Sequence, residues 1–256
     1  MNIHPAAIVE GGAQIAENVI IGAFVYVGKD VAIGPGTVIQ HHASVEGHTI
    51  LGENNQIYPY AFLGGQTQDL KYGGGQTGLR IGDGNIFREY VTVHGGTQEG
   101  SVTTIGSHNA FLAHSHVAHD CTVGSHVIMS SLSALAGYVT LGDYANIAWN
   151  AGVHQFCRIG DYAMVAASSK ALMDVLPFML AEGRPARTRY FNKINLERNQ
   201  FSGAAIEHVK NIYRVLFHSK ARRSEVLGLL RQREREAPEI YGKIIFAIEN
   251  ARRGFC

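Results

Sequence analysis

Apolar side chains recur at every sixth position over most of this chain. Between Ile3 and Val165 an apolar residue occupies 25 of the 28 positions spaced six apart, and the three exceptions are Asp69, Gly75 and Glu99. A period of six fits neither the 3.6-residue repeat of an amphipathic helix nor the two-residue alternation of an isolated strand. It is typical of a parallel β-helix, in which each hexad forms one side of a three-sided coil.

The same repeat predicts where the chain leaves the coil. Each exception lies in a stretch rich in Gly, Gln and Thr, which is typical of loops, so we expect insertions near residues 64–80 and 95–103. Glycines next to the aliphatic positions, such as Gly22 and Gly124, are expected at tight corners that need positive φ or close backbone approach. Residues 18 apart should stack at the strand spacing of about 4.8 Å.

The repeat ends near residue 170, which divides the chain into a β-helix over residues 1–170 and a helical region over residues 171–256. Pro177 and Pro185 bracket a stretch that we expect to connect the two.

Helical spacing of apolar residues follows this connection. Ser202 is expected to cap one helix and Ser224 a second over residues 226–235, while Pro238 should stand in the first turn of the last.

The two regions differ in charge. Residues 1–170 carry 6 Lys and Arg against 12 Asp and Glu (net −6), whereas residues 171–256 carry 16 against 9 (net +7). The basic region favours an acidic macromolecular partner, and the lack of nucleic-acid motifs argues against DNA or RNA. With neither a signal peptide nor an apolar run of spanning length, we expect a cytoplasmic protein without a membrane span. Cys121 and Cys157 lie two coils apart, about 9.6 Å, too far for a disulfide.

Three of the histidines lie close together in one short segment, at His114, His116 and His119, which makes it a candidate for catalysis. The 18-residue spacing puts Gly137 one coil above His119, and His154 and Gln155 two coils above it. Asp120 follows His119 and could orient its imidazole. A histidine that removes a hydroxyl proton, next to a backbone N–H that holds an oxyanion, is the composition of an acyl-transfer site.

Three segments resemble the motifs of UDP-N-acetylglucosamine 3-O-acyltransferases: HVAHDCTVG at 116–124, QDLKY at 68–72 and HQFC at 154–157. The resemblance covers the whole chain. It implies a left-handed β-helical homotrimer that moves a 3-hydroxyacyl group from acyl carrier protein to the glucosamine 3-hydroxyl, the first step of lipid A biosynthesis. No cofactor or metal is expected, because the thioester donor is already activated. The acidic carrier protein would bind the basic C-terminal region.

The resemblance also assigns roles to individual residues. It implies that His119 is the general base, Asp120 its partner and the Gly137 amide the oxyanion donor. The residues implied to contact the substrates are Gln68, Asp69, Lys71, His116, His154, Gln155, Asn192 and Arg198.

Four positions depart from the family pattern. Tyr138 stands where a His is common, and Pro185 and Ile194 replace a His and a Glu that contact the nucleotide. Ala167 replaces a Gly that leaves room for a long acyl tail, so we expect a shorter acyl chain than the Gly-type enzymes accept.

Other functions stay open from the sequence. The acceptor could be a 3-amino sugar nucleotide. A zinc enzyme resembling γ-type carbonic anhydrases could use His94, His114 and His119 as ligands. The related N-acyltransferase of the same pathway has a uridine-binding domain before its β-helix, whereas the hexads here start at Ile3. A non-enzymatic scaffold would not need His119 in register with Gly137.

Overall fold

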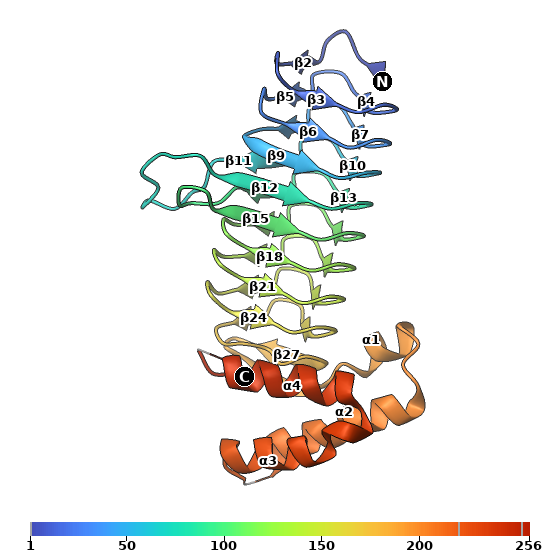
Figure 1. Cartoon of the computed structure of the whole chain (residues 1–256), viewed down its shortest axis with the longest axis vertical. Coiled ribbons are helices and arrows are strands. Elements are labelled where there is room, and N and C mark those ends of the chain that lie inside the picture. Colours follow the sequence, from blue (N-terminus) through green and yellow to red (C-terminus); the bar gives the residue numbers. More distant parts are fainter. Residues whose placement is uncertain (1, 220, 252) are drawn as a thin grey trace.

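The chain winds into a parallel β-helix that is followed by a β-hairpin and helices (Figure 1). This computed structural model describes residues 2–219, 221–251 and 253–256. Strands of the front sheet in Figure 1 run from left to right while the chain descends, which makes the coil left-handed. The predicted fold class is confirmed.

Each coil contributes one short strand to each of three sheets. The first sheet contains, in spatial order, β1 (Asn2–Ile3), β4 (Ile20–Ile21), β7 (Val38–Ile39), β10 (Gln56–Ile57), β13 (Ile86–Phe87), β16 (Ala110–Phe111), β19 (Ile128–Met129), β22 (Asn146–Ile147), β25 (Met164–Val165), β27 (Met179–Gly183) and β28 (Ala186–Phe191). The second contains β2 (Ile8–Val9), β5 (Tyr26–Val27), β8 (Ser44–Val45), β11 (Phe62–Gly65), β14 (Thr92–His94), β17 (His116–Val117), β20 (Ala134–Leu135), β23 (Gly152–Val153) and β26 (Lys170–Ala171). The third contains β3 (Gln14–Ile15), β6 (Ala32–Ile33), β9 (His48–Leu51), β12 (Gly78–Ile81), β15 (Val102–Ile105), β18 (Thr122–Val123), β21 (Thr140–Leu141) and β24 (Arg158–Ile159).

The core contains two inward positions per hexad. The predicted aliphatic position is buried, as at Ile57 and Phe111. A second inward position, two residues earlier, was not predicted because it holds small residues of mixed polarity. Its asparagines stack: the Asn85 amide donates to Asn55 Oδ1 at 2.9 Å. Cys121 and Cys157 also occupy this position, where both are buried free thiols.

The corner glycines meet the expectation through close backbone approach. Gly22 and Gly124 are needed for close approach, since a Cβ there would lie 2.8 Å from the His41 nitrogen and 2.9 Å from the Asp143 nitrogen. Neither glycine has a positive φ. Positive φ occurs two residues later, mostly at residues other than glycine, as at Phe24 with φ 59°.

Two loops leave the coil. The first covers residues 66–77 and the second residues 95–101 (Figure 1). Strand pairing measures their lengths: His48 pairs with Gly78, a step of 30 residues, and Gly78 with Val102, a step of 24. Against the normal step of 18, seen where Asn2 pairs with Ile20, the excess is 12 (30 − 18) and then 6 (24 − 18). Both are whole multiples of six, so the hexad phase survives the insertions.

The stretch between Pro177 and Pro185 is more than a connection. It holds β27, which extends the first sheet in parallel beside β25 and pairs antiparallel with β28. The sequence did not predict this hairpin, because the hexads stop at Asp174 and β28 carries exposed arginines.

Helices cover the end of the β-helix. They are α1 (Lys193–Arg198), α2 (Gly203–His218), α3 (Arg223–Arg233), the 3-10 turn η1 (Glu234–Glu236) and α4 (Pro238–Asn250). In α4, Lys243 forms an ion pair with Asp161 of the last regular coil. Phe255 forms a β-bridge with Asp174, which brings the end of the chain back to the β-helix. Among the described residues, no helix combines the length and the apolar character that crossing a membrane requires.

Two of the three predicted helix starts are confirmed. The Ala205 amide donates to Ser202 Oγ at 3.2 Å, and Pro238 is the first residue of α4. The predicted Ser224 cap is wrong. The helix α3 begins at Arg223, one residue before Ser224, and the Arg222 amide donates to the Glu225 carboxylate at 2.9 Å.

Substitution of the confirmed cap tests its contribution. We expect Ser202→Ala to lower the free energy of unfolding of the helical region by about 0.5–2 kcal/mol, because the Ala205 amide loses its acceptor. Ser224→Ala is the matched control and should change it by less than about 0.5 kcal/mol. Urea unfolding followed by far-ultraviolet circular dichroism measures both; equal losses in the two variants would contradict the assignment.

Candidate active site

The histidine segment lies at a corner of the coil, where β17 of the second sheet ends and β18 of the third begins. Val117 and Val123 point into the core on either side and fix the turn between them. His119 therefore points out of the coil, with 14% of its side chain exposed.

His119 and Asp120 form a hydrogen-bonded pair. His119 Nδ1 lies 2.8 Å from Asp120 Oδ2, and only 7% of the Asp120 side chain is exposed. Because a carboxylate can only accept, the imidazole donates through Nδ1–H. This bond selects the tautomer in which the Nε2 lone pair is free to accept a proton.

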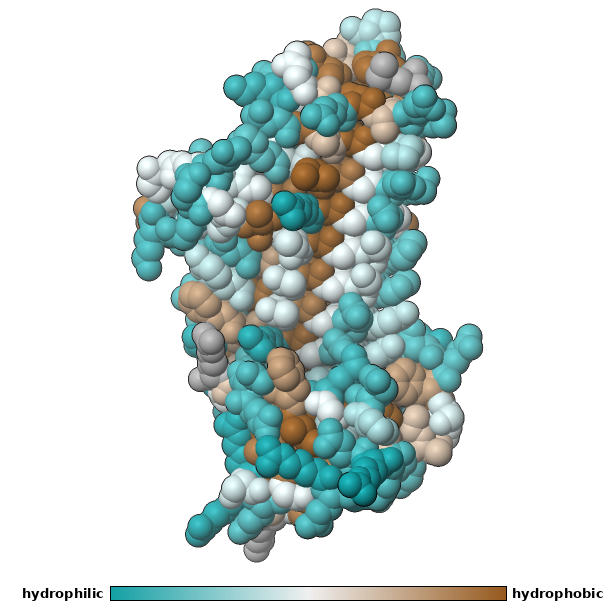
Figure 2. All heavy atoms as spheres, in the orientation of Figure 1, coloured by the Kyte–Doolittle hydropathy of each residue, from teal (hydrophilic) through white to brown (hydrophobic). Residues whose placement is uncertain are grey.

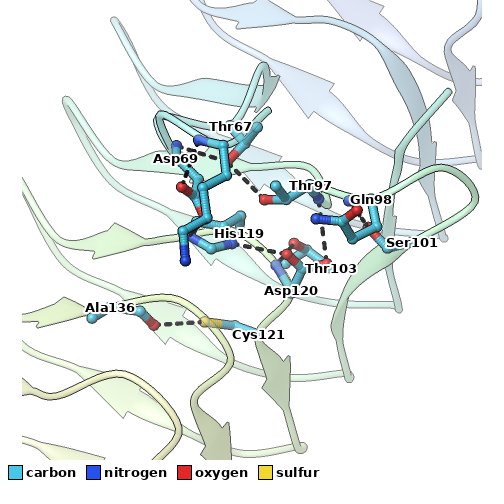
Figure 3. Close-up of polar contacts among 11 residues, drawn as sticks. Thr67, Asp69, Thr97, Gln98, Ser101, Thr103, His119, Asp120, Cys121 and Ala136 are labelled. Atoms are coloured by element: carbon cyan, nitrogen blue, oxygen red, sulfur yellow. Dashed lines mark hydrogen bonds and ion pairs between the residues drawn. The ribbon is translucent and has the colours of Figure 1, made fainter. Parts of the chain in front are cut away.

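Hydrogen bonds to residues of the second insertion and of β15 fix the position of Asp120. Its Oδ1 accepts from the Thr97 amide at 3.3 Å, and its own amide donates to Thr103 Oγ1 at 2.8 Å (Figure 3). Burial raises the pKa of Asp120, but hydrogen bonds from His119, Ser101 and Thr97 outweigh it and hold the pKa below its usual value. The carboxylate therefore stays ionised at neutral pH and can stabilise a protonated His119.

Gly137 lies on the next coil, directly against the imidazole, as the 18-residue spacing predicts. A Cβ on Gly137 would lie 2.4 Å from His119 Cε1 and 2.5 Å from Nε2, so only glycine leaves room for the ring. The Tyr138 amide donates to the His119 carbonyl at 3.0 Å, which joins the two coils at this point. The Gly137 amide itself donates no hydrogen bond within the described part of the chain. Among the described residues, the unbonded Gly137 N–H therefore lies beside the His119 imidazole.

The first insertion brings one carboxylate to the imidazole. Asp69 Oδ2 lies 3.9 Å from His119 Nε2, and the loop is held by Thr67, whose Oγ1 bonds to Thr97 Oγ1 at 2.9 Å (Figure 3). Gln68 and Lys71, predicted with Asp69 as substrate contacts, are exposed on this loop.

Two further histidines flank the site and are neutral at neutral pH. His116 Nδ1 lies 2.7 Å from Thr92 Oγ1, and its ring centroid is 5.0 Å from that of His94. Burial lowers the pKa of His116 to about 4 and also lowers the pKa of His94. Nδ1 of His94 is buried without a hydrogen-bond partner among the described residues. His94 and His116 therefore add no positive charge beside His119 at neutral pH.

The depressed pKa of His116 predicts an acid-sensitive contribution to stability. Its folded pKa of about 4 lies below the ordinary 6.5, so the unfolded chain binds more protons and stability falls as pH drops from about 6.5 to 4. His116→Gln should remove up to about 3 kcal/mol of that loss at the acid end. Urea unfolding of both proteins at pH 7 and pH 4.5 measures this, and parallel pH curves would contradict it.

The other predicted substrate contacts fall in separate places. His154 and His116 line one groove of about 490 Å³ along the second sheet, and Gln155 is exposed at the corner beside it. Asn192 and Arg198 instead line a cleft of about 640 Å³ between the first sheet and α1. This cleft is on a different side of the β-helix from His119, so one chain does not bring the two groups together.

Comparison with known proteins identifies the family of this chain. A family model described as UDP N-acetylglucosamine O-acyltransferase, domain 2, matches residues 174–256. The acyl-(acyl-carrier-protein)–UDP-N-acetylglucosamine O-acyltransferase of Thermodesulfovibrio yellowstonii is 40% identical over 255 residues, which cover 99% of this chain and 98% of that protein. The chain belongs to the UDP-N-acetylglucosamine O-acyltransferase family.

Other UDP-N-acetylglucosamine O-acyltransferases agree. The protein of that name from Syntrophobacter fumaroxidans is 44% identical over 86% of each chain. The crystal structure of the enzyme from Moraxella catarrhalis superposes with a TM-score of 0.95 at 39% identity, over 100% of this chain and 99% of that one. The predicted resemblance and the assignment as an acyltransferase are confirmed.

The zinc alternative finds no support in this member of the UDP-N-acetylglucosamine O-acyltransferase family. In residues 2–219, 221–251 and 253–256, no group of three or more His, Cys, Asp or Glu side chains is arranged to hold a metal ion. Of its proposed ligands, His114 stacks on Tyr90 with ring centroids 4.8 Å apart, whereas His119 is bonded to Asp120.

Tyr138 replaces the histidine common in UDP-N-acetylglucosamine O-acyltransferases with a neutral ring. It stands perpendicular to His119 with centroids 5.3 Å apart and stacks on Phe156 at 4.9 Å. Burial raises the pKa of Tyr138, and the charges of Asp120 and Asp69 raise it further. The phenol therefore packs against the imidazole without adding a charge.

Proposed function

We propose that this protein transfers a 3-hydroxyacyl group from acyl carrier protein to the 3-hydroxyl of UDP-N-acetylglucosamine, the first step of lipid A biosynthesis, with His119 as general base. The observation that carries the proposal is the free Nε2 of an Asp120-bonded His119, packed against Gly137, whose amide has no hydrogen-bond partner among the described residues. Membership in the UDP-N-acetylglucosamine O-acyltransferase family supports the choice of acyl carrier protein thioester and UDP-N-acetylglucosamine as substrates.

The geometry supports a direct acyl transfer. Nε2 of His119 accepts the proton of the sugar 3-hydroxyl while the oxygen attacks the thioester carbonyl. The Gly137 N–H stabilises the negative charge that develops on the carbonyl oxygen. The carbon–sulfur bond then breaks, and the proton on the imidazole passes to the leaving thiolate. Asp120 stabilises the imidazolium between these steps.

We further propose that the enzyme is a cytoplasmic homotrimer with its sites between subunits. We infer this because the predicted substrate contacts are separated within one chain. Asn192 and Arg198 lie in the cleft at α1, on a side of the β-helix that His119 does not reach. A second copy whose cleft faces the His119 corner would complete the site, with Asn192 and Arg198 at the nucleotide. Exposed Gln68 and Lys71 would extend toward the same sugar nucleotide, and His154 and Gln155 toward the acyl donor.

The acyl donor would approach along the second sheet. The basic C-terminal region follows the end of that groove and would attract the acidic carrier protein by long-range electrostatics. In Figure 2, which faces the third sheet, hydrophilic residues gather over the C-terminal helices and the first insertion loop, while the face between them is of intermediate or apolar character. At Ala167, which replaces the family's Gly, a shorter acyl tail than in the Gly-type enzymes is expected.

A single product assay tests the function. The purified protein is given 3-hydroxyacyl carrier protein thioesters of several lengths with UDP-N-acetylglucosamine or its 3-amino counterpart, and products are identified by mass. An alkali-labile ester on UDP-N-acetylglucosamine supports the proposal. An alkali-stable amide formed only with the amino sugar, or no acylated sugar with any pair, would refute it. Light scattering of the same preparation reports the mass of three chains or of one.

A further inference from the structure

Two buried threonines join the insertion loops beside His119. Thr67 of the first loop and Thr97 of the second are 6% and 2% exposed, and their hydroxyl oxygens lie 2.9 Å apart (Figure 3). A hydroxyl that is buried away from water costs free energy unless it is hydrogen-bonded. These two hydroxyls satisfy each other across the two loops.

In the first loop, the Thr67 hydroxyl shapes the turn that carries Asp69. Thr67 Oγ1 accepts from the Asp69 amide at 3.1 Å, and Asp69 Oδ1 in turn accepts from the Lys71 amide at 2.9 Å. Two successive bonds of this kind, from backbone to side chain two residues away, define a tight turn. The other carboxylate oxygen of Asp69 then lies 3.9 Å from His119 Nε2. The position of Asp69 therefore depends on Thr67.

In the second loop, Thr97 holds the Asp120 carboxylate. Its amide donates to Asp120 Oδ1 at 3.3 Å, and its hydroxyl is among the donors that keep the pKa of Asp120 low. Because a carboxylate only accepts and a hydroxyl has one proton, Thr97 must accept from Thr67. Thr67 in turn accepts from the Asp69 amide. The hydrogen bonds thus run in one direction, from the substrate loop to the carboxylate that orients His119.

We propose that Thr67 and Thr97 are positioning residues that couple the first insertion loop to the His119–Asp120 pair. This inference rests on the proposed function and deepens it, because both threonines act through other residues. Asp120 faces Nδ1 of the imidazole and Asp69 faces Nε2. A displacement of either loop therefore changes both sides of the base.

The kinetic test removes each hydroxyl without changing the shape of the side chain. Thr97→Val takes a donor from Asp120, which raises the pKa of that carboxyl. We expect kcat to fall by about tenfold and the acid limb of the kcat/KM profile, which reports the His119–Asp120 pair, to move up by about half a pH unit. Thr67→Val leaves the Thr97 proton in place and loosens Asp69. It should raise KM for UDP-N-acetylglucosamine by about three- to tenfold and leave the acid limb where it is.

Conservative variants and a distant threonine are the controls. Thr67→Ser and Thr97→Ser keep the hydroxyls and should behave like the wild type. Thr37→Val removes a buried hydroxyl in the N-terminal coils, so it should change stability alone. The titratable groups that face the pair are the same in every variant, namely Asp69, His94, His116, Cys121 and Tyr138. An acid limb that stays in place in Thr97→Val, or moves equally in Thr97→Ser, overturns the proposal.

Hydrogen exchange separates this inference from the function it rests on. Thr97→Val should speed the exchange of amides in residues 66–77, which belong to the other loop, by about threefold or more, whereas Thr97→Ser and Thr37→Val should not. Faster exchange supports the coupling even if no acyl transfer is found, in which case only the proposed reaction fails. Unchanged exchange in Thr97→Val counts against the coupling whether or not the wild type is active.

Discussion

His119→Ala is expected to lower kcat by a factor of about 10² or more while leaving the β-helix intact. The substitution removes the imidazole that packs against Gly137, and with it the proposed acceptor for the hydroxyl proton. The core should not suffer, because Val117 and Val123 carry the packing at this corner and the imidazole points outward. Steady-state kinetics with the acyl carrier protein thioester and UDP-N-acetylglucosamine measure the loss.

The matched control is His41→Ala, an exposed corner histidine in the N-terminal coils. It should keep the wild-type kcat. Circular dichroism and gel filtration check that both variants keep the fold and size of the wild type. A correctly assembled His119→Ala protein with near-normal turnover would remove His119 from the mechanism.

Gly137→Ala should be nearly as damaging, with kcat lowered by about 10²–10³. The new methyl group would lie 2.4 Å from His119 Cε1, closer than any real contact, so the imidazole must leave its place beside Asp120. The methyl group would also cover the N–H that is proposed to hold the oxyanion. The same kinetic assay measures the effect.

Gly11→Ala is the control for adding a methyl group to a corner glycine of the same β-helix. A Cβ on Gly11 would meet nothing within 4 Å, so we expect wild-type kcat. If Gly137→Ala and Gly11→Ala behave alike, the close packing of His119 on Gly137 has no role in the reaction.

The sequence predicted the outline of the fold because the aliphatic position of each hexad repeats without regard to what surrounds it. Ile57 and Phe111 could be placed in the core from spacing alone. The second inward position could not, since Asn85 and Cys121 share no polarity that a repeat could detect. The residues with positive φ could not be identified for a similar reason: corners in this coil accept Tyr, His and Asp in a conformation that is usually expected of glycine.

The candidate site was predictable where the coil is regular. A step of 18 residues puts Gly137 on His119, and the same step back from Cys121 leads to Thr103, which holds Asp120 and was overlooked. Thr97 could not be found this way, because the insertions destroy the relation between separation and distance. Asn192 and Arg198 are a different case. They came from family resemblance, and in one chain they lie far from the corner they are proposed to serve.

The two insertions leave the coil and return to it in register, since His48 pairs with Gly78 and Gly78 with Val102. Strand pairing, and not the number of looped-out residues, therefore decides which later side chains face the core and on which side of the prism His119 lies. Loops at this corner can change in length by single codons without moving the catalytic histidine, so substrate contacts can diversify while the coil that carries them stays the same.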